Sequence, residues 1–296
     1  MKTIPQISDL ARKQCKFPKA SKNIFYRNIF SSSKPKNLLK KATDLANSPK
    51  NTISFEKAAR KIRRAISSGL DAPVAYSNLA MVYLQMCKIP SAVVIAEHLS
   101  SKGFDIQANF IAGMAFLTMA RMNKTEADAI LVSDSAGQAY VSVKIDGQIK
   151  QVLVNKETKL RNVASTVKKQ LMEAIECFEA SDKAPIVLFN TALAYQMLSQ
   201  QEVAIEKYNE ILLLPTGSLS DKMLSSVHNN IGVCHYKHYQ TALAEKAFNE
   251  AIKYNSIAAA RENLEIIHND DVDIRVRAGS LQSAELYFDL PGKAHQ

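Results

Sequence analysis

Apolar and small residues recur along the chain at steps of three and four, which is the period of an amphipathic α-helix. In residues 73–99, one apolar face that includes Leu79 and Tyr83 gives way, after a break near Pro90, to a second face that includes Ala92. Proline is tolerated in the first turn of a helix because an N–H there has no partner within the helix. The pattern therefore predicts two helices joined by a short turn.

Small residues also stand twelve positions apart within each such pair of helices. The pairs are Ala46 and Ala58, Ala80 and Ala92, Ala192 and Ala204, and Gly232 and Ala244. The distance between two packed helix axes depends on the side chains at the contact, so small residues allow a close approach. The interval from Ala46 to Ala80, and from Ala58 to Ala92, is 34 residues.

Three other segments keep the register of residues 73–99. Their matching residues are Leu45, Ala46, Ala58, Ile62 and Ala65; Asn190, Ala192, Tyr195, Ala204, Tyr208 and Ile211; and Asn230, Ile231, Gly232, Ala244, Phe248 and Ala251. A two-helix unit of 34 residues with this residue order resembles the tetratricopeptide repeat (TPR). The resemblance covers roughly residues 36–122 and 163–267, although the Trp typical of the first helix is absent from the whole chain.

A further unit begins at residues 105–120, with Gly113 as its small residue, but its second helix does not follow at once. Residues 163–180 supply the better match, through Ala174 and Phe178. Residues 124–162 are therefore interpreted as an insertion. It contains Asp146-Gly147 between two alternating runs, which indicates a β-hairpin, and residues 128–133 are a candidate third strand.

The predicted fold is thus all-α, a right-handed TPR-like superhelix of helical hairpins carrying a small inserted β-hairpin or three-stranded β-element. The expected divisions are a basic N-terminal segment at 1–34, helices at 35–123, the insertion at 124–162, helices at 163–268 and a tail at 269–296. Residues 256–267 keep the register and should form a terminal capping helix. Val272, Ile274 and Val276 alternate, so the tail is either a short strand or loosely ordered.

In the TPR family the first helix of each pair lines a concave face, and projecting the register gives one row of candidate groove residues. They are Ser77, Met81, Leu84, Gln85, Phe110, Met114, Leu117, Phe189, Leu193, Gln196, Met197, Asn229, Val233, Tyr236 and Lys237. A Met-rich apolar groove suits a helical or extended segment of a partner protein. The alternative is that many of these side chains pack against neighbouring helices.

The resemblance also separates subfamilies. Repeats that hold the acidic tails of heat-shock chaperones use several Lys and Arg on the concave face, and Ser77, Met81, Asn229 and Val233 stand in those places here. The apolar row is more similar to that of secretion chaperones and assembly factors.

The net charge of +10 is unevenly spread. Residues 1–64 hold 17 Lys and Arg against three acidic residues, a net charge of +14, whereas the rest holds 21 against 25, a net charge of −4. The candidate basic surface on one helix consists of Lys57, Arg60, Lys61, Arg63 and Arg64. It is interpreted either as a contact for an anionic partner, such as RNA, DNA or lipid, or as a solvated helix face.

Candidate chemistry is sparse. Cys234 and His238 are four residues apart on one helix face, but two ligands do not make a zinc site, and the other cysteines are widely spaced. The sequence contains no GxSxG motif and no Gly-rich phosphate loop. We therefore expect no catalytic residues, no metal, no cofactor and no small-molecule substrate.

The sequence predicts a non-enzymatic, protein-binding scaffold, adaptor or chaperone-like assembly factor. No apolar run reaches the length of a membrane span, so a cytoplasmic location is expected, with membrane-peripheral or exported forms as alternatives. Two other functional classes stay open, which are a nucleic-acid-binding helical array that uses residues 1–64 and a secreted effector or membrane-peripheral assembly factor.

Overall fold

The structure is a computed structural model that describes residues 34–47, 52–132, 138–145, 148–215, 219–254, 258–269 and 281–283. The described elements are α2 (Lys34–Asn47), α3 (Thr52–Ser67), α4 (Pro73–Gln85), α5 (Ile89–Ser101), α6 (Asp105–Val132), β1 (Gln138–Ile145), β2 (Gln148–Asn155), α7 (Lys156–Glu179), α8 (Pro185–Met197), α9 (Gln201–Leu212), α10 (Asp221–Lys237), α11 (Thr241–Lys253) and α12 (Ala259–Ile267).

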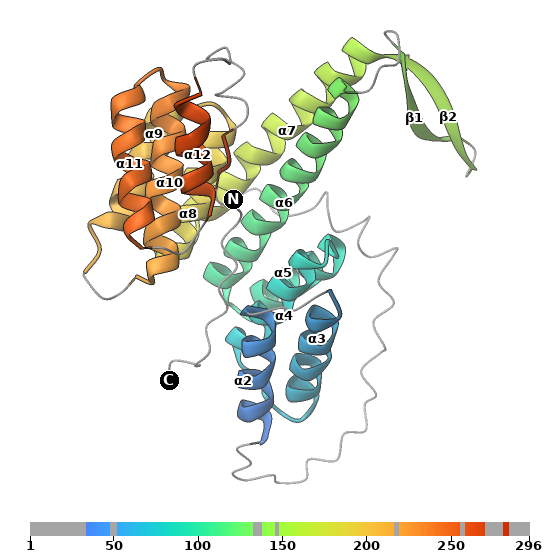
Figure 1. The fold of residues 1–296 in the computed structure, drawn as a ribbon. Helices are drawn as coiled ribbons and strands as arrows, with labels where there is room; N and C mark the ends of the chain where they lie inside the picture. Colours follow the sequence, from blue (N-terminus) through green and yellow to red (C-terminus); the bar gives the residue numbers. More distant parts are fainter. Residues whose placement is uncertain are drawn as a thin grey trace.

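The helices pack in consecutive antiparallel pairs, α2 with α3, α4 with α5, α6 with α7, α8 with α9 and α10 with α11 (Figure 1). Each first helix also packs on the next first helix, in the series α2, α4, α6, α8, α10 and α12. Among the described helices, the second helices do not pack on one another in this way. A row of helices that stays in contact while its partners spread apart lies on the inside of a curve, so the first helices form the inner face of the array.

Three pairs turn from the first helix to the second through the same backbone geometry. Cys87, Ser199 and Tyr239 have φ of 54°, 62° and 60°, which is the left-handed region. In each turn the following residue donates its N–H to a carbonyl five positions earlier, for example from Gln240 to His235 at 2.9 Å. This is the Schellman arrangement that ends a helix and satisfies its last carbonyls.

Close contacts between the paired helices are made at the small residues. A Cβ atom on Gly113 would lie 2.6 Å from the ring of Phe178, and one on Gly232 would lie 2.5 Å from the ring of Phe248. Each aromatic ring therefore occupies the space that a side chain on its partner helix would need. The pairing of Gly113 with Phe178 shows that α6 and α7 are the two helices of one repeat, although residues 133–155 separate them.

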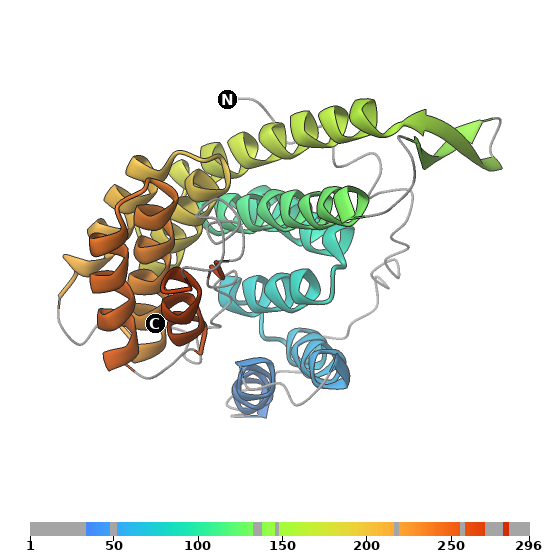
Figure 2. The ribbon, with the colours of Figure 1, turned by 45° about the horizontal axis from the view of Figure 1, so that its top comes forward.

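The long helices α6 and α7 lie side by side, with β1 and β2 beyond their far end (Figures 1 and 2). The two strands pair antiparallel, with Gln138 opposite Asn155 and Ile145 opposite Gln148. Asn155 begins α7 as its N-cap, because its side-chain oxygen accepts the N–H of Glu157 at 2.9 Å. Residues 128–132 belong to α6, so the third strand expected at 128–133 is corrected to helix over these residues.

Both helices also extend into the insertion expected at 124–162, since α6 ends at Val132 and α7 begins at Lys156. Residues 124–132 and 156–162 are rich in Lys, Glu, Ala and Leu, which have high helix propensity. The insertion is expected from residue 124 because the repeat register resumes only at residues 163–180, but packing of α6 on α7 extends both helices into it.

A short helix packs at the C-terminal end of the array. Helix α12, within the capping segment predicted at 256–267, packs on α10 and α11. Residues 1–33 of the expected basic N-terminal segment and the possible strand at Val272, Ile274 and Val276 lie outside the described residues. In the part of the chain that the structure describes, no helix combines the length and apolar character needed to cross a bilayer.

Candidate functional site on the inner face

Most of the predicted groove residues are covered rather than open to solvent. Ten are buried, namely Met81, Leu84, Met114, Leu117, Phe189, Leu193, Gln196, Asn229, Val233 and Tyr236. Ser77, Gln85, Phe110 and Met197 are half-buried, and Lys237 is exposed. The surface left for a partner is therefore narrower and more polar than the Met-rich groove expected from the sequence.

The reason is the packing of the inner row. A first helix contacts its own second helix and also the first helices before and after it. Met81, Leu84, Met114 and Leu117 consequently belong to the hydrophobic core that runs through α2–α8. The alternative interpretation, packing against neighbouring helices, holds for these four side chains.

A chain of buried polar side chains crosses the inner face between α8, α9 and α10. Asn230 donates from Nδ2 to the Tyr208 hydroxyl at 2.8 Å, and that hydroxyl donates to Gln196 Oε1 at 3.1 Å. Burial raises the pKa of Tyr208 well above its ordinary value, so the hydroxyl stays protonated and keeps its donor role at physiological pH. The network fixes the orientation of the Gln196 amide.

A second cluster of amides connects α10 to α12. Asn263 donates from Nδ2 to Asn229 Oδ1 at 2.9 Å, and both side chains are completely buried. The two asparagines are one repeat length, 34 residues, apart. They therefore stand at the same position on successive inner helices.

Three residues of the C-terminal region lie against these amides. Asn263 and Asn229 both donate to the main-chain carbonyl of Gln282, at 2.8 and 3.0 Å, and the Gln282 N–H donates to Asn263 Oδ1 at 2.8 Å. Gln196 Nε2 donates to Ser283 Oγ at 2.7 Å. Leu281 is 8% exposed and belongs to the apolar cluster of α10–α12.

Of these residues, Gln196 and Asn229 are among the predicted groove residues, whereas Asn263 and Leu281–Ser283 are not. The repeat register was the available signal for Asn263, because Asn229 plus one repeat length falls on it. Nothing in the pattern around Leu281–Ser283 distinguishes these residues from the rest of the tail.

The predicted basic surface lies on the outward face of α3. Lys57, Arg60, Arg63 and Arg64 are exposed and Lys61 is half-buried, whereas Ala58, Ile62 and Ala65 of the same helix are buried. The side chains are therefore available to an anionic partner, and equally available to water.

The thiol and imidazole groups near the end of α10 serve packing and surface contacts. Burial raises the pKa of Cys234 to about 12, so its thiol is neutral and a poor ligand or nucleophile at physiological pH. His238 lies 3.1 Å from Glu202 at the surface. Among the described residues, no group of three His, Cys, Asp or Glu side chains is placed to hold a metal ion.

The burial of His228 predicts that the stability of the array depends on pH. Its ring stacks on Tyr254 with centroids 5.9 Å apart, and burial lowers the pKa of His228 from the ordinary 6.5. The folded state therefore takes up this proton less readily than the unfolded state. The resulting contribution to stability is fully present above about pH 6.5 and is lost as the pH falls towards the folded pKa.

We expect His228→Phe to reduce the change in the free energy of unfolding between about pH 6.5 and 5, measured by urea titration at each pH. Equal slopes for both chains would contradict this expectation.

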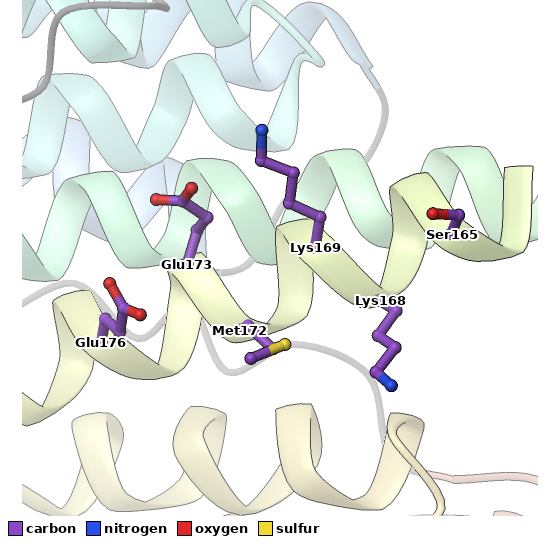
Figure 3. Close-up of a pocket in the computed structure, with 6 residues that line it drawn as sticks. All are labelled: Ser165, Lys168, Lys169, Met172, Glu173 and Glu176. Carbon is purple, nitrogen blue, oxygen red and sulfur yellow. The ribbon is translucent and has the colours of Figure 1, made fainter. Parts of the chain in front are cut away.

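A shallow hollow of about 300 Å³ lies along α7. Figure 3 shows its lining side chains, all from this one helix, namely Ser165, Lys168, Lys169, Met172, Glu173 and Glu176. Lys168 and Lys169 are cationic while Glu173 and Glu176 are anionic, and the side chains point in different directions around the helix. The hollow does not gather groups of one kind around a common point, as a catalytic or anion-binding site would.

No protein-family model and no curated protein matches this chain. Among solved structures, the chain is similar to the crystal structure of a thermophilic TPR protein from Thermus thermophilus. The two sequences are 12% identical, the match covers 83% of this chain and 98% of the other, and the TM-score is 0.48. The helical-pair architecture predicted from the sequence is confirmed by the described helices themselves.

Proposed function

We propose that this chain is a non-enzymatic protein-binding scaffold, of the adaptor or assembly-factor kind, that holds a partner segment against the inner faces of α8, α10 and α12. One observation carries the proposal, which is that Asn229 and Asn263 direct their amides at a main-chain carbonyl and a main-chain N–H. Every peptide offers these two groups, so the arrangement suits an extended protein segment.

The experiment uses a photo-crosslinking residue in place of one of two lysines. Lys237 ends the inner helix α10 and Lys246 lies on the outer helix α11, and both side chains are exposed. We expect affinity capture from the native host, after irradiation, to give a partner crosslinked at position 237 and not at 246. A partner that crosslinks at 246 and not at 237 would overturn the placement on the inner face.

The exposed basic side chains of α3 favour a second candidate function, the binding of a nucleic acid. This candidate predicts an affinity that falls steeply with salt, because each phosphate contact releases counterions. The triple variant Arg60→Ala, Arg63→Ala and Arg64→Ala should reduce the salt slope. Binding to neither RNA nor DNA at low salt would remove the candidate.

We also propose that residues 133–155 are an insertion into one TPR-like unit, because they join two helices, α6 and α7, that otherwise pair as the helices of the other units do. In this arrangement β1 and β2 lie beyond the far end of α6 and α7, away from α8–α12 (Figure 1).

A further inference from the structure

Side chains form hydrogen bonds with the main-chain N–H and carbonyl of Gln282, as a neighbouring strand would. Asn263 accepts the Gln282 N–H and donates to the Gln282 carbonyl, and Asn229 donates to the same carbonyl. The remaining N–H of Asn263 goes to Asn229 Oδ1, so both amides are oriented by their partners. Asn229 and Asn263 are fully buried. The folded protein therefore loses stability if their hydrogen bonds are not made.

The residues on either side of Gln282 are also held. Leu281 lies in the apolar cluster with Val233, Tyr236 and Ile267, and Ser283 accepts from Gln196 on α8. Three consecutive residues thus contact three successive inner helices, and they run from α12 towards α8.

The inner helices also determine how far along the site main-chain groups are recognised. Phe189 on α8 stands three residues before Ala192, as Asn229 stands three before Gly232, so no amide is present at that position of α8. Main-chain recognition is consequently confined to α10 and α12, and α8 contributes a contact to a side-chain hydroxyl through Gln196. The site therefore fits three consecutive residues, which are an aliphatic residue, a residue recognised through its main-chain N–H and carbonyl, and a small residue with a hydroxyl group.

We propose that Leu281–Ser283 occupies the partner site within its own chain. A partner must displace it with an extended segment in which an aliphatic residue is followed two positions later by Ser or Thr. This inference rests on the proposed function, because it assigns to that inner face its ligand chemistry and its competitor. A tethered segment acts at a high effective concentration, so a three-residue contact is enough to lower the apparent affinity of a competing segment.

The test uses full-length protein and a fluorescent peptide of residues 278–286 as the probe, with binding followed by fluorescence anisotropy. Gln282→Pro in the chain removes the N–H that Asn263 accepts without altering any helix, so the site is freed. Gln282→Ala is the matched control, because it keeps that N–H and loses only the side-chain bond to Glu262. We expect Gln282→Pro to bind the probe about tenfold or more tightly than wild type, with Gln282→Ala staying close to wild type.

A second variant tests the site itself. Asn263→Leu in the Gln282→Pro chain should abolish probe binding, and a probe carrying Pro in place of Gln282 should not bind any form. Equal probe binding by wild type and Gln282→Pro would overturn the cis occupancy. Failure of the probe to bind any chain would overturn the backbone-reading site, and so would unchanged binding by a folded Asn263→Leu chain.

The source of the segment is checked by the mass of the particle in solution. If Gln282→Pro converts a dimer into a monomer, the segment comes from a second copy and the cis arrangement is overturned. These results are separable from the crosslinking experiment. A partner that crosslinks at 237 while the probe shows no competition leaves the proposed function standing and removes only this inference.

Discussion

Replacing Phe248 with alanine is expected to lower the free energy of unfolding by about 3–5 kcal/mol, the range for truncating a fully buried aromatic ring. The ring has no exposed surface and fills the space above Gly232, where a Cβ would lie 2.5 Å from Cε1. Leu243→Ala on the same helix is the control, because Leu243 is 48% exposed and its loss should change stability by no more than about 0.5 kcal/mol. Urea titration followed by circular dichroism and by tyrosine fluorescence measures both.

The contact between Gly232 and Phe248 also predicts that the effect of Gly232→Ala on stability changes sign with the residue at position 248. In an exposed helix, Gly→Ala stabilises by about 1 kcal/mol through helix propensity, but overpacking a tight core costs about 1–3 kcal/mol. At Gly232 the clash with Phe248 should win, so Gly232→Ala destabilises the wild-type chain. In a Phe248→Leu background the shorter side chain leaves room, and the same substitution should become stabilising. A Gly232→Ala effect of equal size and sign in both backgrounds would show that the two residues do not compete for space.

The spacing of small residues was sufficient to predict these helix contacts. It paired Gly113 with the helix that carries Phe178 across an interval of more than sixty positions, and the structure brings the two together. Such a contact is predictable because the geometry of a helical pair allows few alternatives once the small residue and the ring are in register.

The exposure of the inner face could not be predicted in the same way. Helices α4 and α8 are apolar around most of their circumference, and Val187, Phe189, Ala192 and Leu193 are all buried on α8. Where a helix is apolar on every side, periodicity does not distinguish the face that meets a partner from the faces that meet other helices. The register places Asn229 and Asn263 on the inner helices, but it does not predict their bonds to Gln282, because that segment lies far along the chain and carries no periodic signal.

Tyr208→Phe is expected to lower the free energy of unfolding by about 1–3 kcal/mol, although it removes a single oxygen atom. The hydroxyl accepts from Asn230 at 2.8 Å and donates to Gln196 at 3.1 Å, and all three side chains are buried. Gln196 Oε1 loses this donor in the variant, and water has little access to replace it. Tyr239→Phe is the control, because Tyr239 is 66% exposed and its hydroxyl can be solvated in either state.

The consequence should extend to the inner face, because Gln196 also donates to Ser283. Without Tyr208 to hold its oxygen, the Gln196 amide is free to rotate, and its bond to Ser283 should weaken. A double-mutant cycle of Tyr208→Phe with Ser283→Ala, read as free energies of unfolding, should therefore give a coupling energy on the order of 0.5 kcal/mol or more. Strict additivity of the two substitutions would mean that the buried network ends at Gln196 and does not support the segment that lies against it.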